Sequence, residues 1–94
     1  MSLSAPLRVP VEILGGARWF RLAHAVSDGG LELGQAAPEE LSGAVELTFH
    51  LPGDRRPIHC HGRVGEAELR FLDLDEDGRA RIVAYIQERL GIPE

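Results

Sequence analysis

The stretch that decides the fold is VELTFHL, residues Val45 to Leu51, in which apolar and polar side chains alternate without interruption. Alternation with a period of two is typical of a β-strand with one buried face, because successive side chains of a strand point to opposite sides. The Pro52-Gly53-Asp54 sequence that follows is rich in turn-forming residues. The stretch therefore predicts a half-buried strand that ends in a turn.

Similar alternation recurs on both sides of this stretch. Upstream, the apolar positions of a first strand are Val9, Val11 and Ile13, and a short strand is expected from Leu31 to Leu33. Downstream, two more strands are expected. The apolar face of one consists of Ile58, Cys60 and Val64, and that of the other consists of Ala67, Leu69 and Phe71. Pro10 has no N–H to donate to a ladder, so the first strand should be at an edge or irregular there.

The remaining strand, from about Arg18 to Val26, has less distinct faces. The spacing predicts one face formed by Phe20, Leu22, His24 and Val26 and an opposite face formed by Trp19, Arg21, Ala23 and Ala25. Glycine-containing turns separate this strand from its neighbours, as in Gly15-Gly16 and Asp28-Gly29-Gly30. About six short antiparallel strands of this kind predict a small barrel or sandwich.

The C-terminal part of the chain has a different period. From about Asp75 to Leu90 the apolar residues Ile82, Ile86 and Leu90 are four apart, which indicates an amphipathic helix. Acidic residues at its start suit the helix dipole, and Gly91 suits its end. The apolar stripe should cover an open end of the barrel.

Composition limits the classes of function. The 94 residues, of which 44% are apolar, suffice for one core, so residues 6–94 are expected to form a single domain after a flexible segment, residues 1–5. The net charge of -5 argues against binding of DNA or RNA. The sequence contains no apolar run long enough to insert into a membrane, and no signal peptide is expected. The one cysteine cannot form an internal disulfide, and a cytoplasmic location is expected.

The order of these elements resembles that of the PilZ domain family. Three segments carry the resemblance: Val26–Leu33, Glu46–Pro52, and Leu69–Leu74 followed by a helix that contains Ala84-Tyr85-Ile86. The likeness extends from about Pro6 to Leu90. It implies a mainly β fold, namely a six-stranded antiparallel PilZ-like β-barrel with one C-terminal α-helix.

The resemblance also implies a ligand, the bacterial second messenger cyclic di-GMP, which the family binds through the motifs RxxxR and D/N-x-S-x-x-G. Arg8 matches the second arginine, but Ser4 stands at the position of the first. Ser27 and Gly30 match the second motif, but Ala25 stands at its Asp/Asn position. Three of the five motif positions are retained.

The missing residues matter because paired arginines can neutralise phosphates and stack on guanine. Arg21, predicted to share a strand face with Ala25, is the preferred substitute for the missing arginine. The candidate ligand-binding residues are therefore Arg8, Ser27, Gly30 and Arg21. The alternative is that Arg8 is an ordinary solvated residue and that Ser27 and Gly30 only form a turn, Gly30 with a positive φ.

Two functions remain open at this point. One is a non-catalytic receptor or adaptor of cyclic di-GMP signalling with weakened or lost binding of the messenger. The other is an interaction module for pilus or motility machinery that does not bind cyclic di-GMP at all. A protein partner is expected in both, and no cofactor other than this ligand is expected. If Trp19 is exposed, it would serve as a partner anchor or as a platform on which a base stacks; if buried, it belongs to the core.

Two further groups of residues suggest metals. One group matches the first positions of a calcium-binding loop and consists of Asp73, Asp75, Asp77 and Gly78. The last position of such a loop requires a bidentate glutamate, but it is Ala84 here. The preferred interpretation of the segment is therefore the capped start of a helix. In the His59-Cys60-His61 segment, a strand would direct Cys60 away from both histidines, which argues against a single metal site and against a Cys–His nucleophile pair. Neither a metal site nor catalysis is expected.

Overall fold

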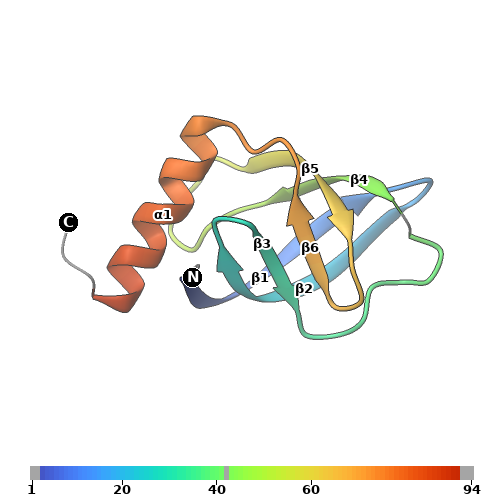
Figure 1. Ribbon diagram of the computed structural model, residues 1–94, viewed down its shortest axis with the longest axis horizontal. Helices are drawn as coiled ribbons and strands as arrows, with labels where there is room; N and C mark the ends of the chain where they lie inside the picture. Colours follow the sequence, from blue (N-terminus) through green and yellow to red (C-terminus); the bar gives the residue numbers. More distant parts are fainter. Residues whose placement is uncertain (1–2, 42, 92–94) are drawn as a thin grey trace.

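The computed structural model describes residues 3–41 and 43–91 and has the architecture expected from the sequence (Figure 1). Six antiparallel strands form a closed barrel in the order β1-β2-β3-β6-β5-β4, and one helix follows. This result confirms the predicted fold class. The elements are β1 (Ser4–Leu14), β2 (Arg18–Ser27), β3 (Gly30–Leu33), β4 (Ala44–Phe49), β5 (Ile58–Val64), β6 (Glu68–Phe71) and α1 (Glu76–Leu90).

The alternating stretch around β4 lies at the centre of the core, as predicted. Val45, Leu47, Phe49 and Leu51 are all buried, with Leu47 completely inaccessible, whereas His50 is exposed. The Phe49 ring stacks on that of Phe71 with 6.1 Å between their centroids. The period-two pattern therefore identified both the strand and the face that it buries.

Strand β1 begins at Ser4, earlier than the sequence pattern indicated. Ala5 is 1% exposed and pairs with Val26 of β2, so Ser4 and Ala5 belong to the barrel rather than to a loose N-terminal segment; residues 1–2 lie outside the described residues. The β1–β2 register shifts between Pro6 and Val9, and the β1–β4 pairing includes only residues 12–14. Pro10 itself stays in register with Leu22, and it has a strand partner on one side because the pairing with β4 begins at Glu12; this agrees with the edge position expected for it.

The predicted faces of β2 are wrong over part of its length. Phe20 and Leu22 are 57% and 37% exposed, although Val26, which was expected on the same face, is 1% exposed. The register between β2 and β3 shifts between Ala23 and Ala25, and such an irregularity reverses the alternation of faces along a strand. Ala23 and Val26 consequently both point into the core.

The helix lies against the end of the barrel at which β1 begins (Figure 1) and contacts β1 and β2. Asp75 caps its first turn by accepting a hydrogen bond from the Gly78 N–H at 2.6 Å, and Gly91 ends it with φ 70°. Ile82 and Ile86 are buried. These observations confirm the predicted capped helix, although the buried stripe stops before Leu90, which is 42% exposed.

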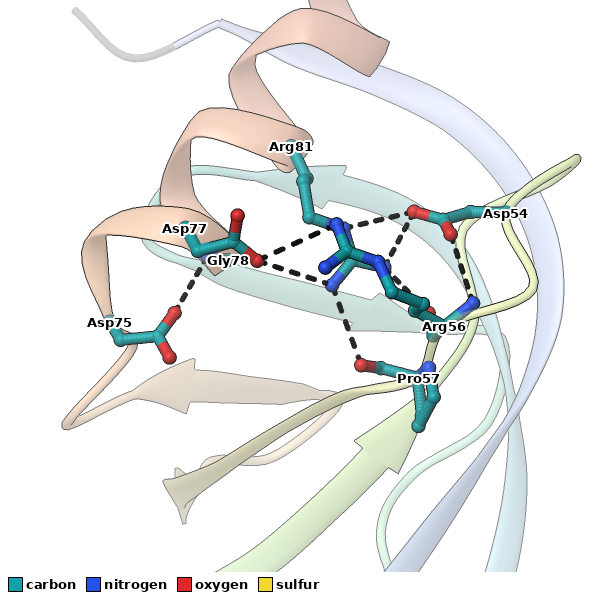
Figure 2. Close-up of polar contacts among 7 residues, drawn as sticks. All are labelled: Asp54, Arg56, Pro57, Asp75, Asp77, Gly78 and Arg81. Carbon is teal, nitrogen blue, oxygen red and sulfur yellow. Dashed lines mark hydrogen bonds and ion pairs between the residues drawn. The ribbon is translucent and has the colours of Figure 1, made fainter.

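A guanidinium ties the helix to the loop between β4 and β5 (Figure 2). Arg81 donates from Nε and Nη2 to Asp54 Oδ2 at 2.9 and 2.5 Å, and from Nη2 to the Arg56 carbonyl oxygen. The hydrogen bond from Arg81 is the main reason why the pKa of Asp54 is lowered.

Among the described residues no helix is long and apolar enough to cross a membrane.

Candidate ligand-binding site

A hollow of about 590 Å³ lies beside the turn between β2 and β3, and we call it the turn hollow. Its lining includes Ser27 and Gly30 together with Ser4 and Ala25, the two positions at which the motifs depart from the family pattern. The strands bring these residues together because Ser4 of β1 and Gly30 of β3 both pair with Ser27. Four of the five motif positions therefore meet in one place.

Hydrogen bonds within the turn fix the shape of this hollow. The Ser27 hydroxyl accepts a hydrogen bond from the Gly29 N–H at 3.2 Å, while the Phe71 N–H donates to the Gly29 carbonyl oxygen at 2.9 Å. The motif serine therefore has a structural role in the turn before any ligand is considered. Ser27 as a whole is half-buried and borders the hollow.

Gly30 is required for a reason that the sequence did not reveal. The prediction of a positive φ is wrong, because Gly30 is an ordinary strand residue paired with Arg70 of β6. A Cβ atom at this position would lie 2.3 Å from the Leu69 carbonyl oxygen. Close approach of two strand backbones, rather than turn geometry, therefore demands glycine here.

The predicted arginines line a different hollow. Arg8 and Arg21 border a hollow of about 340 Å³, which we call the arginine hollow, together with Phe20, Leu22, His24, Gly34 and Gln35. The structure therefore places Arg8 with Arg21, and Ser27 with Gly30, but does not bring the two pairs into one hollow. Strand β2 borders both hollows.

Arg21 is held by its neighbours and does not border the turn hollow, so it does not replace the missing arginine there. Its Nη1 donates to the Phe20 carbonyl oxygen at 2.9 Å, and its guanidinium carbon lies 5.8 Å from the centroid of the Trp19 ring. Trp19 is half-buried against the core, so it is not the exposed anchor considered from the sequence. In the described structure, the buried Nε of Arg21 and Nε1 of Trp19 have no hydrogen-bond partner.

The shift in β2 explains why the preferred substitute is misplaced. The expectation that Arg21 and Ala25 share a face assumed unbroken alternation, but the register changes between Ala23 and Ala25. Ala25 consequently borders the turn hollow and Arg21 the arginine hollow. The sequence pattern contains no signal that locates this shift.

Charge in the turn hollow is poorly suited to a dianion. The charged residues of its lining are one arginine, Arg70, and two glutamates, Glu32 and Glu68. Glu68 lies 4.0 Å from Arg70, an exposed pair of little energetic weight. Sequence reasoning missed Arg70, because only the β3–β6 pairing, which places it opposite Gly30, identifies it as a neighbour of the motif.

The segments that suggested metal sites have separate hydrogen-bond partners. His61 Nδ1 lies 2.7 Å from Asp73 Oδ2, whereas His59 Nδ1 lies 2.8 Å from the Thr48 hydroxyl. Cys60 is buried between them in the core, and burial raises the pKa of its thiol to about 11. Within residues 3–41 and 43–91 no group of three metal-ligating side chains is close enough to hold an ion.

The carboxylates of the calcium-like segment are also engaged separately. Asp73 binds His61, Asp75 caps the helix, and Asp77 lies 3.7 Å from Arg81. Each carboxylate therefore has a local partner that accounts for its position. The segment thus forms the capped start of α1.

Comparison with known proteins supports the fold at low sequence similarity. No family model matches the chain, and no curated protein matches it. Among solved structures, the inhibitor of motility MotI/DgrA of Bacillus subtilis matches with a TM-score of 0.72 and 18% identity, over 100% of this chain and 53% of that one. The chain thus spans about half the length of that protein. At this identity the likeness shows the fold alone, which is the PilZ-like barrel with a C-terminal helix.

Proposed function

We propose that this domain is a non-catalytic PilZ-like adaptor of motility control that binds cyclic di-GMP weakly, in the turn hollow. The likeness in fold to an inhibitor of motility supports the process, and the arrangement of the motif residues supports the ligand site. An adaptor acts through a protein partner, and the messenger would adjust that interaction.

One observation carries the proposal. The turn hollow gathers Ser4, Ala25, Ser27 and Gly30, which are four of the five motif positions, but Ser4 and Ala25 lack the polar side chains that the motifs have there. Serine supplies no charge for a phosphate, and alanine supplies no acceptor for the N–H groups of guanine. Each charged hydrogen bond that is lost costs about 1.5–3 kcal/mol, so the two together weaken binding by a factor of about a hundred or more.

The second candidate function is an interaction module that does not bind cyclic di-GMP. Glu32 and Glu68 favour it, because two carboxylates against the one guanidinium of Arg70 repel a ligand with two negative charges. The two candidates agree on the fold and on a protein partner. They differ only in whether any affinity for the messenger remains.

The test is calorimetric titration of cyclic di-GMP into the wild-type domain and into the double variant Ser4→Arg/Ala25→Asp, which supplies the two motif side chains that the turn hollow lacks. We expect a wild-type Kd above about 100 µM and binding at least about a hundredfold tighter in the double variant. Arg79→Ala, an exposed change on the helix, serves as the matched control and should leave binding unchanged.

Each of the other outcomes has a definite meaning. Wild-type binding in the low micromolar range would contradict the proposed weakness and show that other residues replace the missing contacts. A wild-type domain that does not bind at millimolar ligand, while the double variant binds, would favour the second candidate. Failure of both proteins to bind would remove the turn hollow as a nucleotide site.

A further inference from the structure

The arginine hollow has a charge opposite to that of the protein as a whole. Its titratable lining residues are Arg8, Arg21 and His24, with no acidic side chain among them. The complete chain carries 15 acidic residues against 10 basic ones. A locally basic concavity on an acidic protein selects an acidic ligand through charge complementarity.

Apolar side chains are exposed at the same place. Phe20 and Leu22, which border the hollow, are 57% and 37% exposed and follow each other on the outer face of β2. Pro10, the register partner of Leu22 on β1, is also exposed. An exposed aromatic ring beside arginines is typical of the anchoring part of a protein interface.

The backbone beside these side chains is open to a further strand. β2 pairs with β3 only from Ala23 onward, so residues 18–22 pair with β1 on one side only. On the other side, the contact is a hydrogen bond from the Gly34 N–H to the Leu22 carbonyl oxygen at 3.2 Å. Unpaired strand backbone of this kind can bind an extended peptide by strand addition.

We propose that this surface, the arginine face (Arg8, Phe20, Arg21, Leu22 and His24), binds an extended acidic segment of a partner protein that carries an apolar side chain. Carboxylates of the segment pair with Arg8 and Arg21, and its apolar side chain packs on Phe20 and Leu22. Its backbone runs along β2 between Arg18 and Leu22. This inference rests on the adaptor role proposed above and does not depend on whether the turn hollow binds cyclic di-GMP.

The side chains have properties suited to these roles. Arg8 is exposed and has no ion-pair partner among the described residues, so a carboxylate can approach it without displacing another. The guanidinium of Arg21 is held against the Trp19 ring and the Phe20 carbonyl oxygen, so little conformational entropy is lost when it binds.

The test uses two synthetic octapeptides, one alternating glutamate with leucine and one alternating lysine with leucine. Each is titrated into the isotopically labelled domain and followed by amide NMR shifts. We expect the acidic peptide to shift residues 18–24, Arg8 and Gly34, and to bind at least about tenfold more weakly to Arg8→Glu and to Phe20→Ser. Leu72→Ser, which removes an exposed apolar side chain outside this surface, is the control and should bind normally.

Amide spectra of the variants show whether they remain folded, so loss of binding can be separated from loss of structure. Equal binding of the basic peptide, or shifts located away from the arginine face, would overturn the proposal. Displacement of the acidic peptide by cyclic di-GMP, with shifts at Arg8 and Phe20, would also overturn it, by assigning this surface to the nucleotide. Absence of cyclic di-GMP binding with retention of peptide binding would support this inference while contradicting the proposed ligand.

Discussion

Replacing Gly30 with alanine should damage the barrel itself, whatever the motif glycine contributes to a ligand. The added Cβ would lie 2.3 Å from the Leu69 carbonyl oxygen and 3.1 Å from the Arg70 Cα, both of them backbone atoms of β6. Since side-chain Cβ contacts below 3.0 Å are essentially never found, β6 must retreat from β3 by about 0.7 Å or more. A strand backbone held in a closed barrel cannot make this shift without disturbing its ladder.

These contacts determine how much stability the Gly30→Ala variant should lose. Overpacking of this kind typically costs about 1–3 kcal/mol, and each weakened ladder hydrogen bond adds about 1 kcal/mol. The β3–β6 ladder has only three register pairs, so it has little capacity to redistribute the strain. We therefore expect Gly30→Ala to lower the free energy of unfolding by about 2–4 kcal/mol, which corresponds to a fall in Tm of roughly 10–25 °C for a domain of this size.

The neighbouring glycine provides a matched control. A Cβ on Gly29 would have the Ser27 hydroxyl at 3.8 Å as its nearest contact, and the φ of Gly29 is not positive. Gly29→Ala should therefore leave stability unchanged or raise it by up to about 1 kcal/mol, because alanine restricts the unfolded chain. Urea unfolding followed by circular dichroism measures both variants. A Gly30→Ala protein within about 0.5 kcal/mol of wild type would refute the reasoning from backbone contact.

Other perturbations test the helix and the surface histidine. Ile82→Ala removes a completely buried side chain between α1 and the barrel and should cost about 2–5 kcal/mol in urea unfolding, whereas Leu90→Ala, at a 42% exposed position, should cost less than 1 kcal/mol. The hydrogen bond to Asp73 raises the pKa of His61 above 6.5, and the hydrogen bonds from His61 lower the pKa of Asp73 below 3.8. The stability that protonated His61 contributes to the fold is fully present below pH 6.5 and is lost as the pH rises through the folded pKa of His61. The stability that ionised Asp73 contributes is fully present above pH 3.8 and is lost as the pH falls through the folded pKa of Asp73. In NMR titration the pKa of His61 should therefore fall toward 6.5 in Asp73→Asn, and an unchanged value would contradict the pairing.

Much of the fold could be predicted because the patterns are local. The alternation from Val45 to Leu51 reports burial residue by residue, and the spacing of Ile82 and Ile86 reports the buried face of the helix. Both depend only on the geometry of a single element. Neither prediction depends on the incomplete ligand-binding motifs, and the structure buries the residues that each pattern placed in the core.

The candidate site was harder to predict because it depends on register between strands. The register shift between Ala23 and Ala25 exposes Phe20 and separates Arg21 from the turn hollow. No residue type in β2 indicates where this shift occurs. The role of Gly30 likewise depends on Leu69, a residue of β6 that is distant in sequence. Sequence periodicity does not determine which strand lies opposite which.

The course of β1 is the reason for proposing a different ligand in each of the two hollows. Because Ser4 to Arg8 lie within one extended strand, the two ends of the RxxxR motif are separated by about 13 Å along it. Ser4 lies opposite Ser27 at the turn hollow, whereas Arg8 lies in the irregular stretch between Pro6 and Val9, beside the arginine hollow. An arginine restored at position 4 would therefore add charge to the turn hollow without recruiting Arg8. If cyclic di-GMP binds in the turn hollow as proposed, Arg8 remains available for the acidic segment proposed for the arginine face, where Phe20 also borders the hollow and β2 lacks a β3 partner before Ala23.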